Sequence, residues 1–204
     1  MKHPCDTRAR PRGRRPTLVI MVKAPVAGRS KTRLGREIGM VPAAWWARHQ
    51  LSRLARSLPD PRWNTLLAVA PDVAVHSGAL PPLGRIAQGP GNLGDRMARV
   101  LRHFPGPTLI VGADIPGITR AHISAGFTAL GSHEAVFGPA PDGGYWAIGL
   151  KHTDPLPPRL FDGVRWSSPD ALADTLATLD YRRIAFLAPL HDVDTAADLV
   201  RVSP

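Results

Sequence analysis

Short apolar segments alternate with stretches of helical periodicity along most of the chain, and this alternation limits the folds that the chain can adopt. Thr17–Lys23, Asn64–Ala70 and residues 108–111 have the length and the branched apolar side chains of buried strands. Between them, residues 42–58 and 95–104 repeat apolar side chains at helical spacing. The sequence therefore predicts a three-layer α/β/α domain with a mostly parallel sheet, whose ligands bind at the carboxyl ends of the strands.

The second half of the chain is less regular but continues the alternation. We predict further strands over 83–87, 134–137, 145–150 and 183–187. Thr119 is expected to cap a helix that ends near residue 130. Ser168 is expected to cap a helix that has Pro169 at its first position and ends near residue 179. A last short helix is predicted to begin at Thr195.

Length and composition predict one domain over residues 17–204, preceded by a basic leader. The chain has 204 residues, of which 44% are hydrophobic, which is enough for a single buried core. The leader, residues 1–16, has six Lys and Arg side chains against Asp6, so it supplies +5 of the formal net charge of +10. We expect this leader to be solvated and disordered, although an Arg-rich tail can also contact nucleic acid or a membrane surface.

Cysteine usage and hydropathy favour a protein of the reducing cytoplasm. Cys5 is the single cysteine, which excludes an intrachain disulfide or a thiolate zinc site. The leader lacks the apolar run of a signal peptide, and no segment approaches the ~18 apolar residues of a membrane span. We therefore expect a soluble, unprocessed cytoplasmic protein with no membrane partner.

A basic loop, KAPVAGRSKTRL at residues 23–34, follows the first predicted strand. Gly28 permits close approach of the backbone to a ligand, while Lys23, Lys31 and Arg33 supply cations for phosphate oxygens. It is not a Walker loop, because the first glycine is missing and Gly28 is not adjacent to Lys31. The position of the loop after the first strand favours phosphate binding over a loop that is merely solvated.

A carboxylate follows the clearest strand of the chain, at Asp114 in GADIP. An aspartate at the carboxyl end of a buried strand is well placed to hold Mg²⁺ or Mn²⁺ against phosphates. Asp114 could instead cap the next helix, but Thr119 is available for that role. We therefore favour Asp114 as a metal ligand.

Two further carboxylates, Asp192 and Asp194, lie two residues apart in HDVDT near the C-terminus. We expect at most one of them to join Asp114 directly. From the residues alone, the N-cap of the last helix is at least as good an interpretation of Asp194 as a metal site.

Residues 89–94, GPGNLG, match the G-x-G-x-x-G pattern of dinucleotide-binding loops and open a predicted helix. Pro90 removes a backbone donor that should face the pyrophosphate, and the preceding strand is weak. A dinucleotide-binding oxidoreductase is therefore an alternative that the residues disfavour.

Six segments of the chain together resemble a known family. They are KAPVAGRSKTRL, QGPGNLGDRM, GADIPGIT, GPAPDGGYWAIGL, RWSSPDALADTL and LHDVDTAADL, in that order. They resemble the small bacterial glycosyltransferases of the nucleotide-diphospho-sugar-transferase superfamily, known as domain of unknown function 2064 and found beside radical-SAM or arsenosugar genes. The K-T-R-L and D-V-D-T segments are more distantly similar to phospholactate and molybdenum-cofactor guanylyltransferases.

The resemblance implies a GT-A-like fold and assigns roles that the residues alone leave open. The basic loop would contact nucleotide phosphates, and Asp114 would bind the metal together with Asp194 or Asp192. The loop over 89–96 would contact the nucleotide through Gly91, Asn92 and Gly94. The acceptor or sugar pocket would be bordered by Asp142, Gly143, Gly144, Tyr145, Trp166 and Ser167, with residues 166–168 at a helix N-terminus that could bind an anion. Lys31, Asp114 and Asp142 would be the catalytic residues.

The chain departs from the family pattern at three positions. Ile115 stands where the family usually has cysteine, Arg165 where it has proline, and Ala197 where it has an acidic residue. None of these departures touches the expected phosphate or metal contacts.

The leading functional hypothesis is metal-dependent glycosyl transfer from a nucleotide-sugar to a small-molecule acceptor. The alternative is nucleotidyl transfer, in which a nucleoside triphosphate reacts with a phosphorylated small molecule and pyrophosphate leaves. A third hypothesis is a non-catalytic protein whose basic leader binds nucleic acid, which would make binding sensitive to salt. The sequence leaves the base, the sugar, the acceptor and the oligomeric state open.

Overall fold

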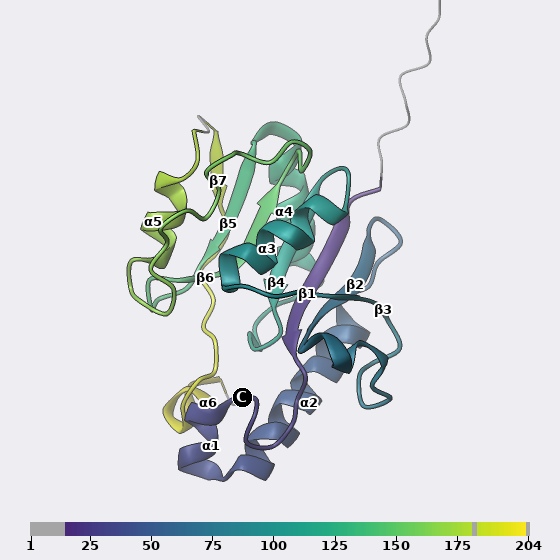
Figure 1. The fold of residues 1–204 in the computed structure, drawn as a ribbon, viewed down its shortest axis with the longest axis vertical. Helices are drawn as coiled ribbons and strands as arrows, with labels where there is room; N and C mark the ends of the chain where they lie inside the picture. The colour runs from purple at the N-terminus through teal and green to yellow at the C-terminus, as the bar shows by residue number, and fades with distance from the viewer. Residues whose placement is uncertain (1–14, 181–182, 203–204) are drawn as a thin grey trace, which may run out of the picture.

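One mixed sheet organises the chain in the computed structural model, which describes residues 15–180 and 183–202. The strands are β1 (Thr17–Lys23), β2 (Asn64–Ala70), β3 (Gly84–Ala87), β4 (Thr108–Gly112), β5 (Ala135–Pro139), β6 (Tyr145–Leu150) and β7 (Ile184–Phe186). Their order across the seven-stranded sheet is β3-β2-β1-β4-β6-β5-β7. Figure 1 shows the sheet with helices on both faces, so the predicted three-layer α/β/α fold is confirmed.

The helices are α1 (Thr32–Ile38), α2 (Met40–Ser57), α3 (Leu93–His103), α4 (Arg120–Ser132), α5 (Ala171–Ala177) and α6 (Ala196–Val202), with a 3₁₀ turn η1 (Asp72–His76). Alternate residues of the strands point to opposite faces of the sheet, which gives two separate cores. The core on one face includes Leu51 and Leu54 of α2 with Ile123 of α4. The core on the other face includes Met97 and Leu101 of α3.

Strand β6 runs antiparallel to both of its neighbours, β4 and β5, whereas β1, β2, β3 and β4 pair in parallel. The first residue of β6, Tyr145, therefore lies at the same edge of the sheet as the carboxyl ends of β1 and β4. This reversal brings the turn before β6 to the edge where parallel strands of an α/β sheet bind ligands.

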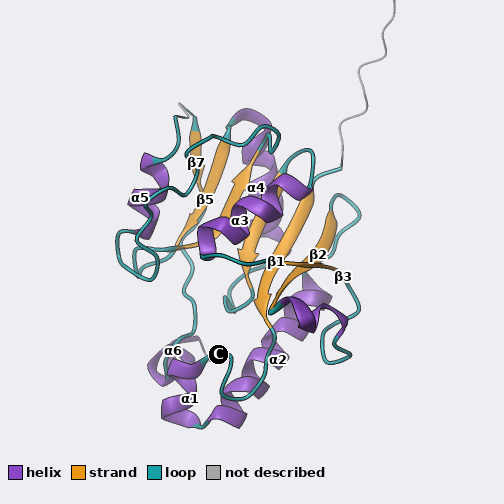
Figure 2. Cartoon of the chain, in the orientation of Figure 1, coloured by secondary structure: helices purple, strands orange, loops and turns teal. Residues whose placement is uncertain are grey.

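A third, small core lies below this edge, where Figure 2 shows α1 and α6 under the loops that leave the strands. Leu34 of α1, Ala43 of α2 and Val193 before α6 are buried there together. Val193 is 0% exposed, and its N–H donates to the carbonyl of Asp114 at 3.2 Å. The segment before α6 is therefore fixed against the residues that follow β4, and α1 packs against this segment.

The helix α1 is the main element that the sequence did not predict. The basic loop was expected to cover residues 23–34, but α1 begins at Thr32. The helix has seven residues and no side-chain cap, so its sequence signal is weak. It forms because Leu34 packs into the third core and because Gly35 allows Met40 to approach its backbone.

The predicted start of α5 is wrong. Ser168 does not cap the helix and Pro169 is not its first residue, because α5 begins at Ala171 and ends at Ala177. The Ser168 hydroxyl instead donates to the carbonyl of Arg165 and accepts from the N–H of Asp170. Residues 166–168 are therefore in the loop before the helix, which removes the argument for an anion site at a helix N-terminus.

Most of the predicted leader lies outside the described residues, which begin at Arg15. Pro16 is already tied to the sheet, because its carbonyl accepts from the N–H of Asn64 at 2.9 Å. Among the helices of residues 15–180 and 183–202, none combines the length and the hydropathy needed to cross a membrane.

Candidate active site

Lys31 connects two carboxylates that are far apart in the sequence. Its ammonium donates to Asp114 Oδ2 at 2.6 Å and to Asp194 Oδ1 at 2.7 Å. Only 12% of its side chain is exposed, whereas Arg33, which donates to Asp194 Oδ2 at 3.2 Å, is 66% exposed. The basic loop, the end of β4 and the segment before α6 therefore meet at Lys31.

The backbone of Lys31 is in the left-handed region, with φ 48° and ψ 46°, directly before α1. This conformation is rare for a residue with a side chain and costs about 1–3 kcal/mol. It is maintained because Leu34 anchors α1 and because both carboxylates hold the ammonium.

Asp114, Asp192 and Asp194 each offer a carboxylate oxygen, and these oxygens lie within 4.8 Å of one another. The expectation that at most one of the last two would join Asp114 is therefore wrong. Residues two apart in an extended segment share a face, so Asp192 and Asp194 can converge while Val193 points into the core between them.

Asp194 does not cap the last helix. Its carboxylate accepts from Lys31 and Arg33, while at the start of α6 the Thr195 hydroxyl donates to the Asp198 carboxylate and accepts from the backbone N–H of Asp198. The start of α6 is thus stabilised by Thr195 and Asp198, and the Asp194 carboxylate faces the basic loop.

The charges of the cluster shift the pKa values of its members. Burial raises the pKa of Asp192 to about 6, and the neighbouring charges of Asp114, Asp194 and Asp142 act in the same direction. Burial alone would lower the pKa of Lys31, but the charges and hydrogen bonds of Asp114 and Asp194 outweigh it and raise that pKa. The cluster therefore has an excess of negative charge that Lys31 compensates only in part.

This donor set fits a hard divalent cation. Three carboxylates converge, and carboxylate oxygens are the ligands that Mg²⁺ and Mn²⁺ prefer. Lys31 itself shows that a positive charge is accommodated between Asp114 and Asp194.

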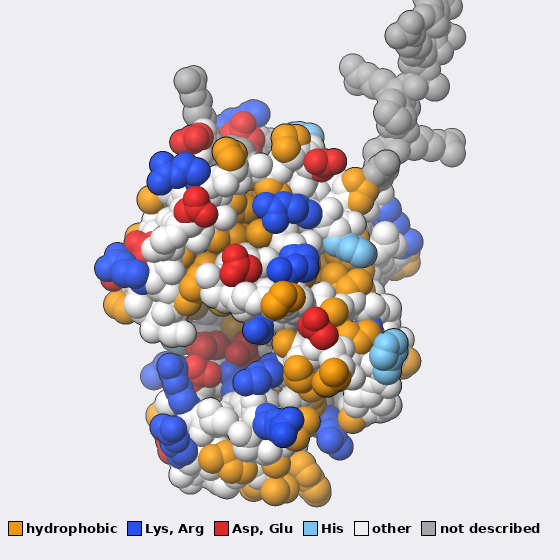
Figure 3. All heavy atoms as spheres, viewed as in Figure 1, with side chains coloured by type: hydrophobic (Ala, Val, Ile, Leu, Met, Phe, Trp, Pro, Cys, Tyr) orange, Lys and Arg blue, Asp and Glu red, His pale blue; other side chains and the backbone are white. Residues whose placement is uncertain are grey.

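A cavity of about 410 Å³ opens beside the cluster. Figure 3 shows acidic side chains gathered in a hollow of this face, with Lys and Arg around it. Among the predicted site residues, those that line the cavity are Lys23, Lys31, Asp114, Asp142, Gly144, Tyr145, Trp166, Ser167 and Asp192.

The other predicted residues lie around this cavity rather than in its walls. Asn92 caps α3, because its side chain accepts from the N–H of Asp95 in a capping box. Gly94 is buried against Phe161 and Trp166, and Gly28 has φ 72° and faces open space. The structure therefore gives Asn92 and Gly94 structural contacts beside any role in nucleotide binding.

Gly143 owes its conformation to the protein rather than to a ligand. It has φ 85°, and a Cβ at this position would lie 2.0 Å from the carbonyl oxygen of Pro169. Its own carbonyl accepts from the N–H of Leu172 at 3.0 Å. The turn before β6 is thus fixed against α5, which positions Asp142 and Tyr145.

Several cavity residues were not predicted from the sequence. They are mainly apolar or aromatic side chains, namely Met21, Trp46, Leu93, Met97, Ile148 and Trp146, together with the buried amide of Gln88. Arg165, where the family pattern has proline, is paired with Asp174 at 2.9 Å. Periodicity identifies the apolar and aromatic residues only as core. Nothing in their spacing distinguishes a cavity wall from a packed interior.

The family model described as "Uncharacterized protein conserved in bacteria (DUF2064)" matches residues 53–168, which is more than half of the chain. The match includes Asp114, Asp142 and Tyr145. Lys31 and the two carboxylates before α6 lie outside it. No curated protein matches the sequence significantly.

Solved structures share the fold across nearly the whole chain. A structure from Desulfovibrio desulfuricans G20, described as a "putative nucleotide-diphospho-sugar transferase", has 26% identity and a TM-score of 0.79, over 89% of this chain and 83% of that one. A 4-diphosphocytidyl-2C-methyl-D-erythritol synthase from Anaerococcus prevotii DSM 20548 has 8% identity and a TM-score of 0.58, over 91% and 93%. A Mycobacterium tuberculosis H37Rv protein, Rv0371c, described in complex with manganese, has 15% identity and a TM-score of 0.52, over 92% and 97%.

Proposed function

The chain belongs to the family described as "Uncharacterized protein conserved in bacteria (DUF2064)", and from this premise we propose that it is a metal-dependent transferase acting on a nucleotide-sugar. The observation that carries the proposal is the convergence of Lys31 with Asp114, Asp192 and Asp194 at the strand ends, beside a cavity of about 410 Å³. The similarity to the nucleotide-diphospho-sugar transferase described from Desulfovibrio desulfuricans supports the same class of substrate.

The carboxylates would hold Mg²⁺ or Mn²⁺, which would neutralise charge on the diphosphate that leaves. Asp114 follows β4 by two residues and its carbonyl accepts from the N–H of buried Val193, the neighbour of Asp192, so both carboxylates project from restrained backbone. Rigid donors favour a cation because little order has to be imposed when it binds.

Lys31 and the cation would compete for the same oxygens. In the structure the ammonium lies between Asp114 and Asp194. With a cation held by these carboxylates, Lys31 would be free to contact phosphate oxygens as a point charge. We therefore infer that nucleotide and metal bind cooperatively. Phosphates that bind Lys31 would free the carboxylates for the metal, and a metal that binds the carboxylates would free Lys31 for the phosphates.

Asp142 lies at the wall of the same cavity, close enough for its charge to raise the pKa of Asp192. We assign it the role of base. In this step an acceptor hydroxyl attacks the sugar carbon, the bond from that carbon to the diphosphate oxygen breaks, and the hydroxyl proton passes to Asp142. The products are the glycosylated acceptor and a nucleoside diphosphate.

The cations that line the cavity favour glycosyl over nucleotidyl transfer. Among the described residues, Lys23 and Lys31 are the Lys and Arg side chains in the cavity wall. Two cations suit a diphosphate better than a triphosphate. A phosphate contact from the exposed guanidinium of Arg33 would instead support the alternative, nucleotidyl transfer.

A thermal-shift panel of nucleotides tests this function. Nucleoside diphosphates and nucleotide-sugars should raise the melting temperature in the presence of Mn²⁺ and much less without it, because a ligand at 100 times its Kd adds about 2.7 kcal/mol of stability. Stronger stabilisation by triphosphates, with release of pyrophosphate on turnover, would identify nucleotidyl transfer instead. No stabilisation by any nucleotide with Mn²⁺ would contradict both.

A further inference from the structure

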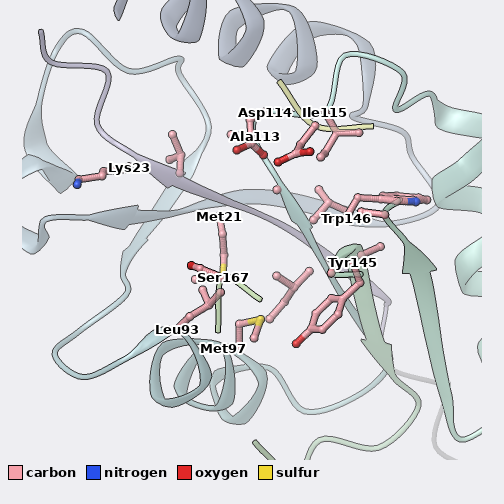
Figure 4. A pocket seen from close by; sticks show the side chains of 18 of the residues that line it. Met21, Lys23, Leu93, Met97, Ala113, Asp114, Ile115, Tyr145, Trp146 and Ser167 are labelled. Atoms are coloured by element: carbon pink, nitrogen blue, oxygen red, sulfur yellow. The ribbon is translucent and has the colours of Figure 1, made fainter. Parts of the chain in front are cut away.

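The cavity extends away from the carboxylates into a lobe with apolar walls. We call it the apolar lobe and define it by Met21, Leu93, Met97, Tyr145, Ile148 and Trp166. All of these except Leu93 belong to the core on the α3 side of the sheet, and in Figure 4 Met21, Leu93, Met97 and Tyr145 lie on one side of the strands, away from Asp114. The apolar lobe therefore adjoins the charged end without sharing its chemistry.

The polar atoms at the apolar lobe are mostly committed to partners within the protein. The Tyr145 hydroxyl lies 3.3 Å from the Thr175 hydroxyl, which donates to the carbonyl of Ala171. The buried amide nitrogen of Gln88 donates to the carbonyls of Val22 and Ala68. Among the described side chains at the apolar lobe, this leaves the side-chain oxygen of Gln88 and the hydroxyl of exposed Ser167 for a ligand.

So few polar groups cannot satisfy a polyhydroxylated ligand. A sugar ring in the apolar lobe would lose its water and leave most of its hydroxyls without hydrogen-bond partners, which is unfavourable. An apolar ring or chain of the same size would instead remove apolar surface of both partners from water. The walls therefore select against a sugar and in favour of an apolar group.

Leu93 supports this selection. It is the first residue of α3, lines the cavity and is 46% exposed. An exposed leucine at the rim of an apolar lobe becomes covered when an apolar group enters.

We propose that the second substrate, the acceptor, has an apolar ring or short chain that fills the apolar lobe and places its reacting hydroxyl at the carboxylate end. The inference rests on the proposed function and specifies its acceptor. Tyr145 of the apolar lobe begins β6 three residues after Asp142, which lines the same cavity. This position matches an acceptor whose proton is taken by Asp142.

A matched pair of probes tests the proposal. Cyclohexanol and myo-inositol have the same ring and differ by five ring hydroxyls. Their binding can be measured by ligand-observed NMR on the full chain, with Mg²⁺ and pyrophosphate at the charged end. Cyclohexanol should bind at least about tenfold more tightly than myo-inositol, because only the apolar ring matches the walls. Equal binding, or tighter binding of myo-inositol, would overturn the proposal.

Variants locate the bound probe. Met97→Gln and Leu93→Gln should each weaken cyclohexanol binding several-fold, and Leu93→Gln keeps the test usable if loss of the buried Met97 disturbs folding. Val73→Gln is the control, because Val73 is 86% exposed and does not line the cavity. Unchanged binding in both lobe variants would place the probe elsewhere and reject the proposal.

Competition distinguishes the acceptor from the nucleobase. If the apolar lobe takes the acceptor, nucleosides should leave cyclohexanol bound. Displacement of cyclohexanol by a nucleoside would assign the apolar lobe to the base and overturn the proposal. Failure of pyrophosphate and Mg²⁺ to bind at all would instead contradict the proposed function, so the two failures are separable.

Discussion

The two ends of the cavity are suited to ligands through different interactions, charge at one end and apolar contact at the other. At the charged end, Lys31 and three carboxylates are held within a few ångströms, and the position of single atoms decides which ion or ligand fits. At the apolar lobe, contact area decides binding, and no single wall atom is indispensable. We therefore expect large, charge-specific effects from substitutions at the first end and small, graded effects at the second.

The largest effect is expected at the charged end from Asp114→Asn. The substitution keeps the volume and removes one charge, and it should weaken Mn²⁺-dependent nucleotide binding on the order of 100-fold. Calorimetry measures the loss, and circular dichroism should show an unchanged fold. Asp162→Asn, at an exposed aspartate outside the cavity, is the control. If Asp114→Asn binds as tightly as the unsubstituted protein, Asp114 is not a metal ligand.

Lys31→Met should have opposite effects on two ligands. Without its ammonium, Mn²⁺ alone should bind about tenfold more tightly, because the competing cation is gone, while a nucleoside diphosphate should lose about 1.5–3 kcal/mol of affinity. The corresponding nucleoside should be unaffected. Lys151→Met, at the other end of β6, is the matched control. Equal losses for nucleoside and nucleotide would mean that the loop has collapsed, and the exchange model would be wrong.

Acidification should weaken metal binding through Asp192. Because its pKa in the metal-free fold is raised to about 6, Mn²⁺ must displace a proton below this pH, and its affinity should fall up to about tenfold per pH unit. The free energy of unfolding without metal depends on pH in the opposite direction to the Mn²⁺ affinity. Between the unfolded pKa of about 3.9 and the folded value, the folded state binds more protons, so this group makes stability fall as pH rises.

Asp192→Asn checks that assignment, because it should remove the pH dependence of Mn²⁺ binding between pH 5 and pH 7 along with part of the affinity. Persistence of the full pH dependence in this variant would show that another group is responsible.

The smallest effect at the charged end is expected from Arg33→Lys. Arg33 is 66% exposed and makes one contact at 3.2 Å with Asp194, so solvent screens its charge. Loss of the planar fork should weaken nucleotide binding only about two- to fivefold. Arg36→Lys, one turn further along α1, is the control, and equal changes in both variants would show that the guanidinium of Arg33 has no special role.

The sequence predicted the charged end better than the apolar lobe. Asp114 and Lys31 follow strands with clear apolar signatures, so their place at the strand ends follows from the alternation of elements. Met97 and Ile148 have the spacing of ordinary core residues. Whether a core residue faces a cavity depends on packing between α3 and the sheet, which no local pattern encodes.

The convergence of Asp192 and Asp194 on Asp114 also could not be predicted from local sequence patterns. It depends on Val193, which is buried with Leu34 and Ala43 and fixes the segment before α6. The start of α5 was misplaced because Ser168 and Pro169 have the composition of a helix start, while in the structure Pro169 lies against Gly143 and α5 begins at Ala171. Tertiary packing overrides local capping preference in both cases.

The central claim is that a divalent cation exchanges with Lys31 among Asp114, Asp192 and Asp194. Anomalous diffraction from crystals grown with Mn²⁺ and a nucleoside diphosphate tests it most directly. We predict a manganese peak bound to oxygens of these carboxylates, with the Lys31 ammonium displaced onto the phosphates. A manganese peak away from the three aspartates, or an ammonium that remains between Asp114 and Asp194 while the nucleotide is bound, would contradict the account.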